Sequence, residues 1–141
     1  MTPEEIVKDP EGLAELAREY DLALVILFGS RVTGHTHTES DTDIGVLRRE
    51  GLIPSKRFFE LEFRLSQVIH LVGEIQMVDL RRASGLLRHN AARNAIVLYE
   101  AMPGIMSSFC SLAWRLYQDE RLDFRRHDLE YIQRAVAELM K

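Results

Sequence analysis

The spacing of apolar residues along the chain predicts alternating strands and helices. The run Leu22–Phe28 contains no polar residue and ends at Gly29-Ser30, which is typical of a strand buried on both faces. After a polar stretch, a second strand is expected over Asp41–Leu47. Between Pro54 and Val72, apolar residues recur at spacings of three and four, which predicts the longest central helix.

Turn and cap residues divide the rest of the chain. Thr2 and Asp9 each precede a proline, so a short helix is expected after each of them. The remaining expected elements are a strand over Glu74–Leu80, a helix over Ala83–Asn94, a strand over Ala95–Tyr99 and two C-terminal helices. This order predicts an α/β or α+β fold, a small sheet with helices packed on one face.

Composition limits the class of protein. The chain has 141 residues, 46% of them hydrophobic, and a formal net charge of -4. This length predicts one domain over residues 1–141, and no apolar run reaches the roughly 18 residues of a membrane span. The mildly acidic balance argues against direct nucleic-acid binding. A single cysteine, Cys110, and an N-terminus without a signal-peptide pattern predict a cytoplasmic protein.

One motif carries chemistry: Gly29-Ser30, ten residues, and then Asp41-Thr42-Asp43. A glycine lets a phosphate approach the backbone, and a serine hydroxyl can donate a hydrogen bond to a phosphate oxygen. Asp41 and Asp43 are two residues apart on a strand, so both carboxylates face the same way and can hold magnesium. Arg31 could also reach a phosphate, although an exposed loop arginine is the alternative interpretation.

These residues resemble the signature of the minimal nucleotidyltransferases (MNT) in the DNA polymerase beta superfamily. The likeness extends through Ser40, the stretch 78–84 and Leu98-Tyr99-Glu100 to nearly the whole chain. It implies a mixed-sheet nucleotidyltransferase core over residues 1–100, with a helical extension over 101–141. It also implies Mg²⁺ with ATP as nucleotide substrate, a nucleotide site that includes Gly29, Ser30, Arg31 and Ser40, and metal ligands Asp41 and Asp43.

The resemblance further implies a partner. Small bacterial members act as antitoxins that attach AMP to a tyrosine of a HEPN-domain ribonuclease toxin. An alternative is a nucleotidyltransferase for a small molecule, although such enzymes have further domain mass for the acceptor. Another is a catalytically impaired antitoxin that acts by binding alone.

The third strand departs from the family pattern. Similar members read Val-Asp-Leu-Val-Asp-Leu there, whereas this chain reads Ile75-Gln76-Met77-Val78-Asp79-Leu80. Gln76 therefore occupies the place of the third carboxylate, and Glu74 shares its face. Strand periodicity puts Asp79 on the opposite face, with Ile75 and Met77, which are expected in the core.

The C-terminal segment is unusually apolar. Ile105 to Tyr117 carries two apolar stripes on one helix, which requires cover on most sides. Burial beneath a final helix, with Leu129, Ile132, Val136 and Leu139 as its own stripe, is one explanation. A partner surface that includes the arginine-rich stretch 121–126 is the other.

Overall fold

The structure, a computed structural model, describes residues 2–29, 42–70 and 75–140, and of residues 42 and 123–128 the backbone alone. In chain order, the helices and strands are α1 (Pro3–Ile6), α2 (Pro10–Glu19), β1 (Leu22–Phe28), β2 (Thr42–Arg48), α3 (Ser55–Val68), β3 (Ile75–Asp79), α4 (Gly85–Arg93), β4 (Ile96–Glu100) and α5 (Ile105–Leu139). The sequence predicted these elements to within a few residues, apart from the last helix.

Both N-terminal helices begin at the predicted cap residues. The Thr2 hydroxyl accepts from the backbone N–H of Glu5, while the Glu5 carboxylate accepts from the N–H of Thr2. At α2, the Asp9 carboxylate accepts from the N–H of Gly12 at 3.0 Å. These bonds satisfy donors that the first turn of a helix leaves unpaired.

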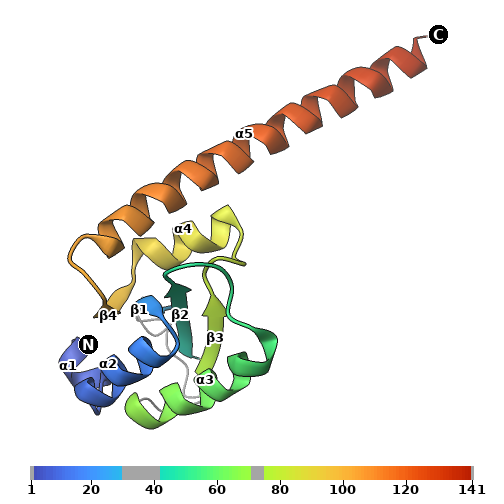
Figure 1. Cartoon of the computed structure of the whole chain (residues 1–141). Coiled ribbons are helices and arrows are strands. Elements are labelled where there is room, and N and C mark those ends of the chain that lie inside the picture. Colours follow the sequence, from blue (N-terminus) through green and yellow to red (C-terminus); the bar gives the residue numbers. More distant parts are fainter. Residues whose placement is uncertain (1, 30–41, 71–74, 141) are drawn as a thin grey trace.

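The strands form one mixed sheet in the order β3-β2-β1-β4 (Figure 1). β1 is antiparallel to both β2 and β4, whereas β2 and β3 are parallel. β1 lies inside the sheet, and its seven residues are all buried, as its uninterrupted apolar sequence predicts. The end of β1 and the starts of β2 and β3 therefore meet at one edge of the sheet.

Helices cover both faces of this sheet, so the expectation of helices on one face was wrong. On one face, α1, α2 and α3 pack on alternate strand residues such as Val25, Leu27 and Ile44. On the other face, α4 and α5 pack on Leu24 and Ile26. Because β1 is apolar at every position, both of its faces need cover, and one layer of helices supplies only half of it.

The C-terminal region is one continuous helix, α5, and not two. Its first half packs on α4, and its second half projects away from the rest of the chain (Figure 1). The expected burial of residues 105–117 beneath a final helix was therefore wrong. Within the described ranges, no helix has an apolar stretch long enough to cross a lipid bilayer.

Candidate active site at one edge of the sheet

Asp43 occupies the edge where three strands meet. It is in register with Phe28 on β1 and with Gln76 on β3. Residues that pair in register point to the same face of a sheet, so Asp43 and Gln76 lie side by side on the face that α4 and α5 cover. Asp43 is half-buried and Gln76 is exposed. A carboxylate and an amide are thus neighbours at this edge.

Gly29 provides the close approach that the motif requires. Its φ is +101°, a backbone conformation that side chains rarely adopt. A Cβ at this position would collide with the Asp43 carboxylate. The backbone of the turn after β1 therefore lies directly against the Asp43 side chain. Any residue with a Cβ at position 29 would displace the Asp43 carboxylate.

The glycine two residues after Asp43 has a packing role. A Cβ on Gly45 would come within 2.9 Å of the Leu80 side chain and 3.0 Å of Ile26. Both neighbours are fully buried. Gly45 thus lets the residues after β3 pack closely on β2, which holds the strand that carries Asp43 in place.

Asp79 lies on the opposite face from Gln76, as strand periodicity predicts. It is 4% exposed, and its Oδ2 accepts from the backbone N–H of Ile53 at 2.9 Å. Its Oδ1 accepts from the N–H of Arg81 at 3.1 Å. Both carboxylate oxygens are engaged by backbone donors, so Asp79 ties the entry of α3 to the turn after β3.

Part of the predicted site lies outside the described residues. Gly29, Asp43, Gln76 and Asp79 are described. The others, which fall in the ranges 30–41 and 71–74, are Ser30, Arg31, Ser40, Asp41 and Glu74. Among the described residues, no group of three or more His, Cys, Asp or Glu side chains could hold a metal ion.

The described residues at the edge fit magnesium in their chemistry. Mg²⁺ takes oxygen ligands, and the carboxylate of Asp43 and the amide oxygen of Gln76 are both oxygen donors. Asp43 brings one negative charge and Gln76 brings none. The pair therefore fits a site whose remaining ligands come from other residues, water or phosphate.

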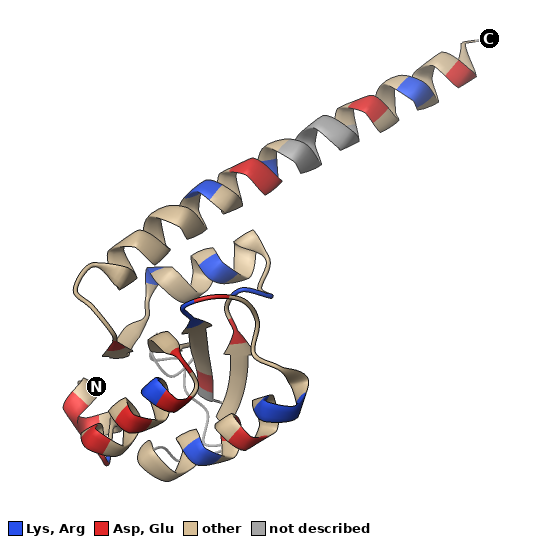
Figure 2. Cartoon of the chain, in the orientation of Figure 1, with Lys and Arg blue, Asp and Glu red and all other residues tan. Residues whose placement is uncertain are grey.

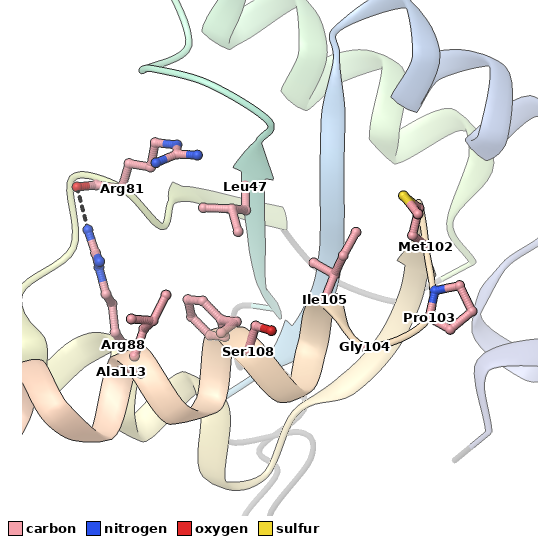
Figure 3. Close-up of a pocket in the computed structure, with 11 residues that line it drawn as sticks. Leu47, Arg81, Arg88, Met102, Pro103, Gly104, Ile105, Ser108 and Ala113 are labelled. Atoms are coloured by element: carbon pink, nitrogen blue, oxygen red, sulfur yellow. Dashed lines mark hydrogen bonds between the residues drawn. The ribbon is translucent and has the colours of Figure 1, made fainter.

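A pocket of about 460 Å³ lies at the other end of β2, where Leu47, Ile105 and Phe109 contribute to its wall (Figure 3). Leu47 is four residues from Asp43, which is about 13 Å along a strand. Two arginines on the rim of the pocket donate hydrogen bonds to backbone carbonyls. Arg81 donates to the carbonyl of Arg49 at 2.8 Å, and Arg88 donates to that of Arg81 at 2.7 Å (Figure 3). This pocket is thus separate from the strand edge.

Three glutamates hold helices and strands in place through hydrogen bonds to backbone N–H groups, and sequence patterns did not identify this role. Glu62 accepts from the N–H of Met77 at 3.2 Å, so α3 satisfies a donor on the edge strand β3. Glu100 accepts from the N–H of Met106 at 2.7 Å and caps α5. Glu120 accepts from the N–H of Gly85 at 2.9 Å and caps α4. Only the stretch containing Glu100 was singled out from the sequence, and there by resemblance.

The lone cysteine has no catalytic setting. Cys110 is half-buried on α5, and burial raises the pKa of its thiol. A raised pKa disfavours the nucleophilic thiolate. Cys110 lies in the apolar segment 105–117, where a structural role is expected.

Comparison with known families gives one domain match. The family model described as Polymerase beta, Nucleotidyltransferase matches residues 11–103. The match ends just before α5 begins. A search of curated proteins finds no significant match.

Several solved structures share the fold. The chain is 25% identical to one in the crystal structure of a toxin–antitoxin with AMP-PNP, with a TM-score of 0.68, over 89% of this chain and 98% of that one. It is 23% identical to a chain of the MntA-HepT toxin–antitoxin, with a TM-score of 0.62, over 88% and 96% of the two chains. A complex of the tri-AMPylated Shewanella oneidensis HEPN toxin with its MNT antitoxin matches at 23% identity and a TM-score of 0.62, over 88% and 95%.

Proposed function

The chain belongs to the Polymerase beta, Nucleotidyltransferase family, and from that premise we propose that it is an antitoxin that transfers AMP from ATP to a tyrosine of a HEPN-domain toxin. The observation that carries the proposal is the likeness to a chain of a toxin–antitoxin crystallised with AMP-PNP, which covers 89% of this chain and 98% of that one. A related HEPN toxin is AMPylated in its complex with an MNT antitoxin.

The proposed reaction replaces the phosphoanhydride bond between the α- and β-phosphates of ATP with a phosphate ester to tyrosine. The phenolic oxygen of the toxin tyrosine attacks the α-phosphorus of ATP, and a new O–P bond forms. The bond from the α-phosphorus to the bridging oxygen breaks, and pyrophosphate leaves. Because the amide of Gln76 cannot take up a proton near neutral pH, the phenolic proton passes to water.

Each residue of the motif has a role in this proposal. Gly29 and Ser30 bind the triphosphate through backbone and hydroxyl, and Arg31 and Ser40 complete the nucleotide site. Asp41 and Asp43 would hold Mg²⁺, which when bound neutralises charge on the phosphate oxygens. The bare backbone of Gly29 against the Asp43 carboxylate supports this assignment, because a triphosphate must lie close to both.

Gln76 tunes the proposed site. It lies in register with Asp43, where a third carboxylate would bring a further negative charge and a proton acceptor. An amide brings neither, so nucleotide binding is retained while the chemical step is slower than in members with the acid. The proposed enzyme is therefore active but slow at limiting magnesium.

Two other functions use the same fold. A small-molecule nucleotidyltransferase would need an acceptor pocket beside Asp43, and the pocket in Figure 3 lies at the opposite end of β2. An antitoxin that acts by binding alone is favoured by the amide at position 76.

One experiment separates the three functions. The purified chain is incubated with magnesium, ATP labelled on the α-phosphate and a HEPN-domain toxin encoded beside it. The proposal expects label on a toxin tyrosine. Label on a small-molecule acceptor alone supports the first alternative, and toxin inhibition without any label supports the second.

A further inference from the structure

The outer half of α5 exposes a row of large apolar side chains. Their exposed fractions run from 48% to 86%. The row, here called the distal stripe, consists of Leu122, Leu129, Ile132, Val136 and Leu139. All residues from 129 to 140 are exposed, and this half of the helix projects beyond the rest of the chain (Figure 1). Nothing in the described chain covers the distal stripe.

The spacing of the distal stripe matches the seam of a coiled coil. Leu122, Leu129 and Val136 follow one another at intervals of seven. Ile132 and Leu139 form a second set at the same interval, three residues after Leu129 and Val136, whereas the position three residues after Leu122 is Arg125. Both heptad positions are therefore apolar from Leu129 to Leu139. Apolar residues at these two heptad positions bury themselves against a second helix, with knobs packed into holes. The outer half of α5 is therefore built for a helical partner.

The helix also needs such a partner for its own stability. Most helical stability in proteins comes from packing of the apolar face of the helix. Contacts with α4 and the sheet hold only the first half of α5, where Phe109 and Ala113 are buried. Within the described ranges nothing gives the outer half comparable cover, and another chain could supply it.

We propose that the distal stripe pairs with the distal stripe of a second copy of this chain. The sequence of the outer half has as many arginines as acids, four of each, at positions 121, 123, 125, 126, 128, 130, 134 and 138, and Figure 2 shows both signs on the described part of it. A surface of mixed sign selects neither an acidic nor a basic partner, whereas it is compatible with its own copy. An apolar stripe is likewise complementary to itself, as a two-fold interface requires.

The exposed side chains of the distal stripe contribute area from both copies. Specific interfaces bury about 1,200 Å² or more in total, and each of the five side chains has at least 48% of its surface exposed for burial. The strand edge with Asp43 lies on the sheet and not on the outer half of α5. A dimer built through the distal stripe thus leaves both candidate active sites free, and it does not depend on the proposed function.

The test is the mass of the purified full chain in solution. Light scattering after size exclusion at micromolar concentration is expected to give twice the chain mass of 16.3 kDa. Ile132→Glu places charges in the seam, so the dissociation constant of the dimer should rise at least about tenfold. Glutamate is a good helix former, so circular dichroism should still show a folded chain. Leu129→Glu gives an independent second variant at the same seam.

The matched control is Phe63→Glu, which changes an apolar residue that is 67% exposed on α3. It should leave the dimer intact. A wild-type mass of 16.3 kDa throughout the micromolar range would overturn the proposal, as would a dimer that Ile132→Glu does not weaken. The proposal would also be overturned if the chain is a monomer and its amides at 129–139 become protected from hydrogen exchange only when the toxin is added. The distal stripe would then be a binding site for the toxin.

Discussion

Asp43 on β2 and Gln76 on β3 are register partners, so an acid and an amide stand side by side at the edge of the sheet where β1 ends. The family pattern has a carboxylate at the second position. Gln76 keeps a side-chain carbonyl oxygen, on a side chain one methylene longer than that of aspartate, but it brings no negative charge. The first prediction follows from this difference.

Gln76→Asp should raise the rate of AMP transfer at limiting magnesium by at least about tenfold, because the new carboxylate adds a metal ligand and a proton acceptor beside Asp43. The measurement is the initial rate of labelled AMP incorporation into the toxin at several magnesium concentrations. Gln67→Asp, at an exposed position on α3, is the control for the change in net charge.

An unchanged rate in Gln76→Asp, with loss of transfer in a folded Asp79→Asn variant, would assign the third ligand to Asp79. The outward position of Gln76 and the backbone bonds of Asp79 lead us to expect the opposite.

Asp79→Ala should lower the free energy of unfolding by about 2 to 4 kcal/mol, because it leaves the N–H groups of Ile53 and Arg81 without their acceptor. Asp79→Asn should lower it by less, since the amide oxygen can replace one of the two bonds. Urea unfolding measures both effects. Asp119→Asn on the exposed side of α5 should unfold at the wild-type midpoint, and an Asp79→Ala variant as stable as that control would refute the structural role.

Glu120→Ala should loosen the contact between α4 and α5. The lost cap leaves the N–H of Gly85 unpaired, which costs about 1 kcal/mol. The expected result is a lower melting temperature in thermal unfolding. Asp119→Ala removes the neighbouring acid without touching α4 and should cost less. Equal melting temperatures for the two variants would mean that the cap contributes nothing to stability.

The first half of α5 is the surface where we expect the toxin to bind. Leu112 and Trp114 are exposed there, whereas Phe109 and Ala113 face the core. Exposed tryptophans often dominate interface energies, so Trp114→Ala should weaken toxin affinity at least about tenfold in calorimetry. Phe59→Ala, at an exposed aromatic residue on α3, is the control. Equal toxin affinity for Trp114→Ala and the wild type would mean that the toxin binds another surface. The side chains of Arg125 and Arg126, which the sequence also marked for this surface, lie outside the described set.

Local sequence patterns predicted most of the sheet and the opposite faces of Gln76 and Asp79. The bounds of β1 could be predicted because Leu22–Phe28 is apolar throughout and stops at a glycine. The opposite faces of Gln76 and Asp79 follow from the period of two along a strand. In both cases the information lies within a few neighbouring residues.

Features that depend on distant residues could not be predicted in this way. The cap from Glu120 joins α5 to α4 across 35 residues of the chain, so it depends on how the two helices pack together. The cap from Glu100 joins the end of β4 to α5 and depends on the course of the turn between them. The division of residues 105–139 into two helices was wrong, although the absence of glycine and proline there favours one helix. An apolar stripe does not reveal whether its cover comes from the same chain or from another.

The central claim is that the strand edge around Asp43 transfers AMP to the toxin. Its most direct test is the rate at which wild type and Asp43→Asn attach labelled AMP to a toxin tyrosine, each shown to be folded by circular dichroism, with Asp119→Asn as the matched control. We predict robust labelling by the wild type and the control. For Asp43→Asn we predict a loss on the order of a thousandfold or more, because a charge aimed at the metal is removed. Asp41→Asn should behave in the same way. Near wild-type labelling by Asp43→Asn would contradict the account.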